Sequence, residues 1–244
     1  MIRLQNLTRR FDDLLAVNDL TLEVPSGKIV ALLGANGAGK TTTLNMLTTL
    51  LEPTSGSAEV CGYDVVRQGP DVRRILGYVP EHGALYEGLT ADEYLELAGR
   101  MRGLEPAVLG PKVDHFLEFF DVAEVRGQRL GTFSKGMRRK ILVAAALLHE
   151  PEVLFLDEPM DGLDVRSQKR LGDLLMEQAA AGRTVVYSSH ILQQVEELCQ
   201  HVVLIHEGQL RYEGTLDALQ GDHAGAGLRD IFLDLTGDAD EVSA

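Results

Sequence analysis

The 244 residues of the chain are enough for one large domain or two small ones with a sizeable hydrophobic core. Hydrophobic residues make up 45% of the sequence and charged residues 25%, as in ordinary globular proteins. The 37 acidic residues outnumber the 23 Lys and Arg residues, which argues against a protein that wraps along DNA or RNA.

The first predicted elements are short strands followed by a helix. Ile2 to Leu4 and Leu20 to Val24 alternate apolar and polar residues, which predicts strands with one face in water. Ile29 to Leu33 is apolar throughout, which predicts a strand buried on both faces. A helix is predicted over Thr41 to Leu50.

A helical insert is predicted next, over about Thr90 to Leu148. Apolar residues recur there at spacings of three and four, as in Val113, Phe116, Leu117 and Phe120. We expect a helical subdomain at about residues 85–148. The eight apolar residues from Ile141 form the longest unbroken apolar run of the chain. Because crossing a bilayer takes about 20 such residues, no membrane span is predicted.

The second half of the chain predicts further buried strands that alternate with helices. The strands are expected at Val153 to Leu156, Thr184 to Tyr187 and Val202 to Ile205, and the helices at Val165 to Ala181 and Leu192 to Leu198. This alternation is typical of a parallel sheet with crossover helices.

The last residues predict a hairpin, a link and a short helix. Glu207 and Gly208 form the turn of a hairpin from Val202 to Tyr212, and Gly221 to Gly227 predicts a flexible link. Beyond it, four apolar residues share one helical face: Leu228, Ile231, Phe232 and Leu235. We therefore expect one large domain over residues 1–220 and a linked tail with a short helix over residues 221–244.

A phosphate-binding loop follows the buried strand Ile29 to Leu33. The residues from Gly34 to Thr42 fit the pattern G-x-x-x-x-G-K-[ST] between a strand and a helix. Backbone N–H groups would converge on the phosphates, Lys40 would reach the terminal ones and Thr41 would ligate Mg²⁺. The predicted contacts are Gly34, Asn36, Gly37, Ala38, Gly39, Lys40, Thr41 and Thr42.

Acidic residues follow the strand Val153 to Leu156. Because parallel strands present side chains at their carboxyl ends, Asp157 is expected near the Mg²⁺ that Thr41 would hold. Glu158 is expected to polarise a water in line with the γ-phosphate. His190 ends another predicted strand, from which it can reach the γ-phosphate.

The chain at this point resembles the nucleotide-binding subunits of ABC transporters. The specific match is Phe133-Ser134-Lys135-Gly136-Met137, a variant of the family signature, placed shortly before Asp157 and Glu158. The resemblance implies that Ser134 and Gly136 open a helix that is presented to ATP held by a second copy. Lys135 and Met137 replace the common Gly and Gln, as in a branch of bacterial exporters. The basic residues Arg138, Arg139 and Lys140 are expected to form a solvated face.

Other positions also match the family. The resemblance implies that Phe11 stacks on adenine, that Asp161 to Asp164 form a dimer contact and that His190 is the switch histidine. A core role for Phe11 is the alternative. Glu81 stands where the family has a Gln that contacts Mg²⁺. Whether this carboxylate ligates the metal stays open, because it adds charge beside the acids after the strand.

We therefore expect an α/β fold: a RecA-like P-loop NTPase core with an antiparallel β subdomain and a helical subdomain. The predicted function is an ATPase that dimerises with a second copy on Mg-ATP and powers an integral membrane permease. Its expected location is the cytoplasmic face of the cell membrane, with no nucleic acid partner. One alternative is a soluble ABC-type ATPase of DNA repair or translation. Another is a nucleotide-gated binding module without turnover.

Overall fold

The computed structural model describes residues 1–223 and 226–237, whose strands form two sheets. The antiparallel sheet has the order β2-β1-β4-β5. Its strands are β1 (Ile2–Phe11), β2 (Leu14–Val24), β4 (Ser55–Val60) and β5 (Tyr63–Asp64). The predicted first two strands are confirmed but are longer than the alternating patterns indicated, and β4 and β5 were not predicted.

The main sheet has the order β10-β9-β3-β8-β7-β6, with β10 antiparallel to β9 and the remaining pairs parallel. Its strands are β3 (Ile29–Leu33), β6 (Leu76–Val79), β7 (Val153–Asp157), β8 (Thr184–Ser189), β9 (His201–His206) and β10 (Gln209–Thr215). Every residue of β3, β7 and β8 is buried. The apolar runs therefore predicted the central strands and the hairpin, while the short edge strand β6 was not predicted.

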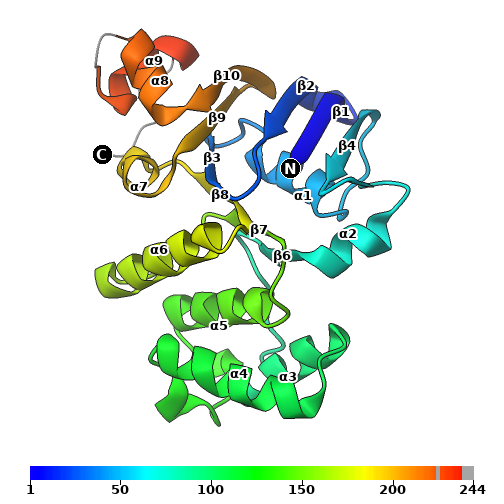
Figure 1. Ribbon diagram of the computed structural model, residues 1–244, viewed down its shortest axis with the longest axis vertical. Coiled ribbons are helices and arrows are strands. Elements are labelled where there is room, and N and C mark those ends of the chain that lie inside the picture. The colour runs from blue at the N-terminus through cyan, green and yellow to red at the C-terminus, as the bar shows by residue number, and fades with distance from the viewer. Residues whose placement is uncertain (224–225, 238–244) are drawn as a thin grey trace.

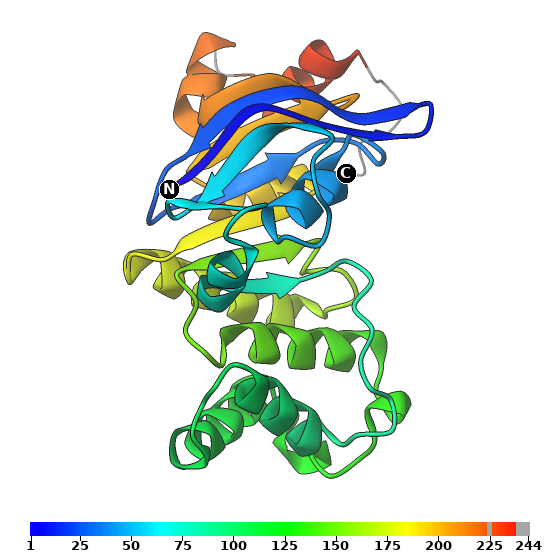
Figure 2. The same cartoon turned by 90° about the vertical axis from the view of Figure 1, so that its right-hand side faces the viewer.

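The main sheet separates two hydrophobic cores (Figure 2). Ile29, Ala31 and Leu33 of β3 pack on the side of α6 (Val165–Ala180) and α7 (Leu192–Leu198). The intervening residues of β3 pack with the antiparallel sheet, α1 (Lys40–Leu47) and α2 (Gly69–Ile75). Helix α1 ends at Leu47 rather than at Leu50, because Thr49 adopts a left-handed backbone with φ 64°.

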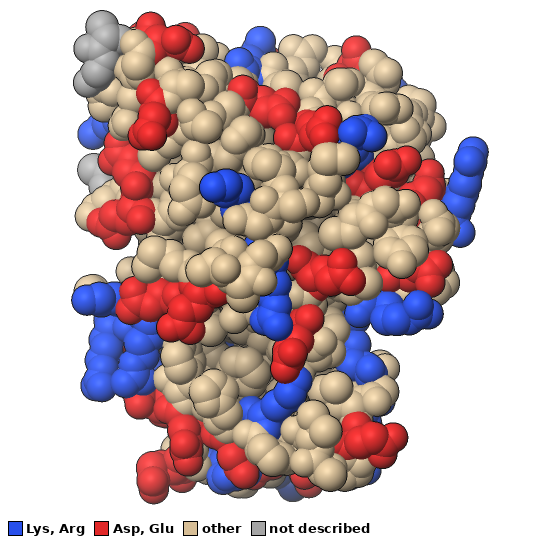
Figure 3. All heavy atoms as spheres, in the orientation of Figure 1, with Lys and Arg blue, Asp and Glu red and all other residues tan. Residues whose placement is uncertain are grey.

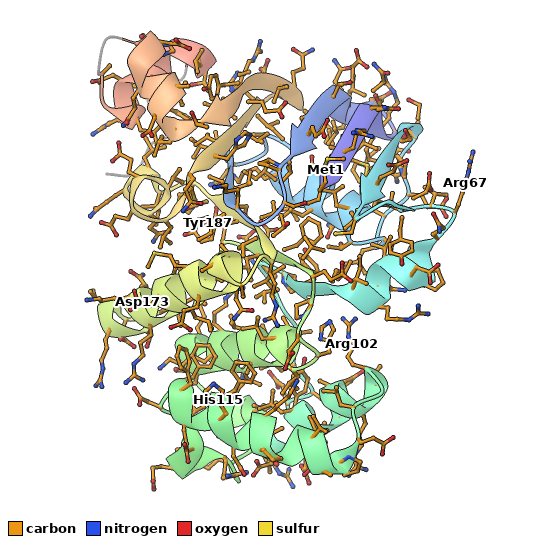
Figure 4. The ribbon with its side chains drawn as sticks, in the orientation of Figure 1. Met1, Arg67, Arg102, His115, Asp173 and Tyr187 are labelled. Atoms are coloured by element: carbon orange, nitrogen blue, oxygen red, sulfur yellow. The ribbon has the colours of Figure 1, made fainter. Side chains whose placement is uncertain are left out.

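The predicted helical insert forms a separate layer below the main sheet (Figure 1). It contains α3 (Ala91–Met101), α4 (Pro106–Phe119) and α5 (Lys135–Leu147), with 3-10 turns at Ala123–Val125 and Leu130–Thr132. Just after α3, the Arg102 guanidinium donates to the carbonyl oxygen of Arg73 on α2, and Figure 4 shows Arg102 between the two layers. None of the helices in the described part of the chain has the length and apolar character of a membrane span.

The carboxyl-terminal region differs from the predicted link. Helix α8 (Leu216–Asp222) runs through the expected boundary at residue 220, so Gly221 belongs to a helix rather than to a link. Residues 224–225 of that link and residues 238–244 of the tail lie outside the described residues. Helix α9 (Leu228–Thr236) is confirmed. Three of its four predicted apolar residues are buried, and Leu235 packs partly buried against the same core.

Candidate functional site

The predicted phosphate loop connects β3 to α1 and is packed tightly by its neighbours. Gly39 has φ 104°, and a Cβ there would lie 2.6 Å from the carbonyl oxygen of Ala16. A Cβ on Gly34 would lie 2.3 Å from the carbonyl oxygen of Ile205. Since only glycine fits at both positions, β2 and β9 together determine the shape of the loop.

Lys40 is the first residue of α1, at the end of this loop, and is only 6% exposed. Its ammonium donates hydrogen bonds to the carbonyl oxygens of Gly34, at 2.7 Å, and Ala35, at 3.1 Å. The positive charge is therefore held over the backbone that surrounds the predicted phosphate position. Phosphate oxygens would compete with these carbonyls for the ammonium protons.

Asp157 ends β7 beside the first turn of α1 and is completely buried. The Thr41 hydroxyl donates to Asp157 Oδ2 at 2.7 Å, and the Ser188 hydroxyl donates to Oδ1 at 2.5 Å. Ser188 also accepts a hydrogen bond from the backbone N–H of Glu158 at 3.0 Å. The sheet thus brings Thr41 and Asp157 into contact, as the strand order of a parallel sheet predicts.

Glu158 pairs with His190 at the carboxyl ends of the adjacent strands β7 and β8. The distance from His190 Nδ1 to Glu158 Oε1 is 2.9 Å, and the Glu158 side chain is 11% exposed. Burial raises the pKa of Glu158, the hydrogen bond and charge of His190 and the charge of Lys40 oppose this, and Asp157 raises the pKa further. Glu158 also has a left-handed backbone with φ 47°, a strained conformation that recurs at functional sites.

These elements surround a cavity of about 490 Å³. One wall is Phe11, which is 40% exposed and whose ring centroid lies 4.4 Å from the Arg9 guanidinium carbon. The predicted residues that line the cavity are Phe11, Asn36, Gly37, Gly39, Lys40, Thr41, Thr42, Glu81, Asp157 and Glu158. The predicted residues outside this lining are Gly34, Ala38, Ser134, Gly136 and His190.

The signature residues lie at the amino end of α5. Ser134 is exposed and caps the helix, since its hydroxyl accepts from the backbone N–H of Met137 at 3.2 Å. A Cβ on Gly136 would lie 2.5 Å from the carbonyl oxygen of Gly162. Lys135 Nζ lies 2.6 Å from Asp161 Oδ2, and this hydrogen bond is the main reason that the pKa of Asp161 is lowered. The signature therefore packs against the predicted dimer-contact segment of its own chain.

The prediction of a solvated basic face is wrong for Arg139, which is only 3% exposed. Its guanidinium donates to the carbonyl oxygens of Pro80, at 2.7 Å, and Glu81, at 2.6 Å. Sequence reasoning missed this because the loop that covers Arg139 comes from a distant part of the chain. The two backbone carbonyls replace the water that the prediction assigned to this side chain.

The residues at the cavity suit a magnesium ion in part. In residues 1–223 and 226–237, no group of three or more His, Cys, Asp or Glu side chains could hold a metal. The hydroxyl of Thr41 and the carboxylate of Asp157 are nevertheless oxygen ligands of the kind that Mg²⁺ uses beside phosphates. The donor set therefore fits a metal that shares its coordination with a bound nucleotide.

The structure also places residues at the site that sequence reasoning did not select. Ser188 contacts Asp157, and its position two residues before His190 at a strand end was the available signal. Glu207 and Gly208, in the turn between β9 and β10, line the cavity. Gly208 donates its backbone N–H to the carbonyl oxygen of Ala38 at 2.9 Å, so the turn supports the phosphate loop.

Comparison with known proteins supports the same assignment. The family model described as ABC transporter matches residues 17–161. The ABC transporter ATP-binding protein NatA of Bacillus subtilis is 37% identical, over 96% of this chain and 97% of its own length. The daunorubicin resistance ATP-binding protein DrrA3 of Streptomyces coeruleorubidus is 38% identical, over 92% of this chain and 71% of its own length.

Solved structures confirm the predicted fold. A structure described as the ATP binding subunit of an ABC transporter has a TM-score of 0.90 and 33% identity, and covers 96% of this chain and 99% of that one. An ATP-binding cassette solved as a dimer with ADP and Pi, MJ0796, has a TM-score of 0.81 at 22% identity, which supports the fold alone. With the phosphate loop, the acidic pair and these similarities together, the chain belongs to the ABC transporter ATP-binding family, whose members bind and hydrolyse ATP.

Proposed function

We propose that two copies of the chain close around two ATP molecules, and that Ser134 and Gly136 of each copy complete the pocket of the other. The observation that carries this proposal is the position of Ser134, which is exposed at the start of α5 and outside the cavity lining of its own chain. A hydroxyl and a helix amino end are suitable partners for phosphate. The helical subdomain, at about residues 85–148, would present them to the second copy.

In this proposal a few side chains have separate roles in binding and hydrolysing ATP. Glu158 takes the proton of the attacking water, and His190, 2.9 Å away, holds the Glu158 carboxylate in place. Lys40 leaves the loop carbonyls to contact the terminal phosphates, and Phe11 stacks on the adenine. The backbone N–H groups around Gly37 and Gly39 bind the remaining phosphate oxygens.

Thr41 and Asp157 would hold Mg²⁺, and Glu81 at the edge of the same cavity is a third candidate. A bound Mg²⁺ supplies positive charge that offsets the charge of the phosphates. Ser188 keeps the Asp157 carboxylate oriented through its 2.5 Å hydrogen bond. A fixed orientation of the carboxylate matters because Thr41 and Asp157 would have to present their oxygens to the ion together.

The rate of hydrolysis is expected to fall on acidification at a higher pH than an ordinary glutamate would give. Burial raises the pKa of Glu158, and the general base must be ionised to accept a proton. The same shift means that the folded protein holds this proton more tightly than the unfolded chain does. Its contribution to stability therefore declines as the pH rises through the raised pKa.

Steady-state phosphate release, measured from neutral to acid pH, checks this expectation. Nucleotide affinity should be measured at each pH as the control, so that lost binding is not mistaken for a protonated base. A rate that stays flat down to the range in which a solvent-exposed glutamate titrates would contradict the role of Glu158.

The proposed partner in the cell is an integral membrane permease of an exporter, which places the chain at the inner face of the membrane. Relatives with export functions support this: the Nod factor export ATP-binding protein I of Cupriavidus metallidurans is 33% identical over 96% of this chain. The acidic balance of the sequence disfavours the alternative of a nucleic acid partner. On the face in Figure 3, basic and acidic residues are interspersed rather than gathered into a basic stripe.

The proposed pairing is tested by light scattering on the purified chain with Mg²⁺ and a non-hydrolysable ATP analogue. We expect the wild type to double its mass on adding both, and Ser134→Asp to stay monomeric. Asp can still cap α5, so the loss of pairing would come from the charge placed near phosphate. Ser134→Asn, which caps without a charge, is the matched control and should pair. A wild type that remains monomeric would refute the proposal.

A further inference from the structure

Arg139 is a buried cation whose guanidinium holds the backbone of a distant loop. Its side chain is only 3% exposed, and its two terminal nitrogens donate to the carbonyl oxygens of two consecutive residues, Pro80 and Glu81. The distances of 2.7 and 2.6 Å are those of good charge-assisted hydrogen bonds. The guanidinium donates to the two acceptors from two separate nitrogens held in one plane, whereas the Lys40 ammonium contacts its two loop carbonyls from a single nitrogen.

The segment that Arg139 holds forms an edge of the nucleotide cavity. Pro80 and Glu81 come directly after β6, at the start of the loop that leads to α3. Glu81 lines the 490 Å³ cavity and also a second cavity of about 330 Å³, and Arg139 lines only the second. Arg139 therefore contacts the backbone of the loop from the side away from the nucleotide site.

The carboxylates that act on the Arg139 charge include residues of the nucleotide site. Burial lowers the pKa of Arg139, while nearby carboxylates favour its charged form. These carboxylates, in decreasing order of effect, belong to Asp161, Asp157, Glu81 and Glu158. A buried guanidinium without a carboxylate in hydrogen-bonding contact is costly, and an apolar residue could fill the same space more cheaply. The position of the charge is thus better explained by the loop that it fixes than by packing.

We propose that Arg139 is a positioning residue that fixes Glu81 at the edge of the nucleotide cavity, where the Glu81 carboxylate contributes to magnesium binding. This inference rests on the proposed function, because it assigns Glu81 to the metal–nucleotide complex. Ser134 and Arg139 also belong to the same helix end, Ser134 as the N-cap of α5 and Arg139 in its second turn. A shift of α5 therefore moves the support of Glu81 together with the signature.

A double-mutant cycle tests whether Arg139 acts through Glu81. The readout is the Mg²⁺ concentration that gives half-maximal enhancement of binding of a fluorescent ATP analogue, with the metal-free affinity measured alongside. Arg139→Lys keeps the charge but loses the two-pronged contact, and it is expected to raise this concentration by about tenfold, as for other groups that support a metal ligand. The affinity for the analogue without Mg²⁺ should not change.

Glu81→Ala should raise the Mg²⁺ requirement by itself, and adding Arg139→Lys to it should change the value by less than about twofold, because coupled residues are not additive. The matched control is Arg170→Lys. Arg170 lies on α6 and, like Arg139, its guanidinium donates to a backbone carbonyl, that of Phe119 at 2.9 Å. This control should leave the Mg²⁺ requirement at its wild-type value.

An equal effect of Arg139→Lys with and without Glu81, or no effect in either background, would overturn the proposal. If thermal melting shows that Arg139→Lys does not fold, Arg139→Gln replaces it, since its amide offers two N–H donors without the charge, and the same cycle is judged on that variant. A wild-type protein that does not bind the analogue at all would refute the proposed function instead. Normal Mg²⁺-dependent binding by the wild type, with Arg139→Lys unchanged, would refute the role of Arg139 alone.

Discussion

Replacing Glu158 with Gln is expected to lower the steady-state rate of ATP hydrolysis by about 10²- to 10⁴-fold, the usual contribution of a general base. The amide keeps the size of the side chain and can still contact His190, but it cannot accept a proton from water. The binding residues of the phosphate loop are unchanged, so the variant should bind ATP and remain paired with a second copy. Phosphate release and light scattering on the same sample measure both effects.

A charge-matched control separates the loss of a base from the loss of a charge. Glu118→Gln on α4 removes one carboxylate from an exposed position far from the cavity, and it should hydrolyse ATP at the wild-type rate. Equal rates for Glu158→Gln and the wild type would remove Glu158 from the mechanism. A slow variant that also fails to bind ATP would indicate structural damage instead.

Mixing two inactive variants is expected to restore hydrolysis, because each proposed pocket draws on both copies. Lys40→Ala removes the phosphate contact of the loop, and Ser134→Asp places a negative charge at the amino end of α5. Each variant alone should lose about 10²-fold or more in rate, as when one stabilising group of a charged transition state is removed. A mixed pair contains one damaged pocket with both substitutions and one intact pocket.

The size of the recovery gives a quantitative check. Because Ser134→Asp is not expected to pair with itself, every copy of it that pairs does so with Lys40→Ala, and each mixed pair has one of its two pockets intact, so with equal amounts up to about half of the wild-type rate should return. This figure assumes that one intact pocket works alone. Mixtures that stay as inactive as their components would contradict pockets shared between copies, and Ser134→Asn mixed with the wild type is the control for dilution.

The arrangement of residues at the cavity could be predicted from sequence because it depends on local patterns. The loop from Gly34 to Thr42 fits the phosphate-loop pattern, and the apolar run before it and the helical stretch after it supply the strand and the helix that this pattern needs. The contact between Thr41 and Asp157 follows from the rule that parallel strands end at the same edge. These expectations need no knowledge of distant packing.

The residues that sequence reasoning missed depend on contacts between distant segments. Arg139 is one of several basic residues after the signature, and its sequence position does not show that it is buried. Its burial depends on the loop at Pro80 and Glu81, which comes from a distant part of the chain. The backbone N–H of Gly208 donates to the carbonyl oxygen of Ala38, although the two residues are far apart in the sequence. The short strand β6 has four residues, too few for a period to be recognised. The glycines of the stretch Gly221 to Gly227 predicted a flexible link, whereas Gly221 belongs to the helix α8.

The strand order has a consequence for any attempt to isolate a minimal nucleotide-binding fragment. Residues 17–161, by which the family is recognised, include β3 and the phosphate loop, but both neighbours of β3 in the main sheet, β8 and β9, come later in the chain. A fragment cut at residue 161 would leave β3 with two unpaired edges, which invite aggregation. A fragment that binds ATP must therefore extend beyond residue 161 to include β8 and β9, although residues 17–161 are enough to recognise the family.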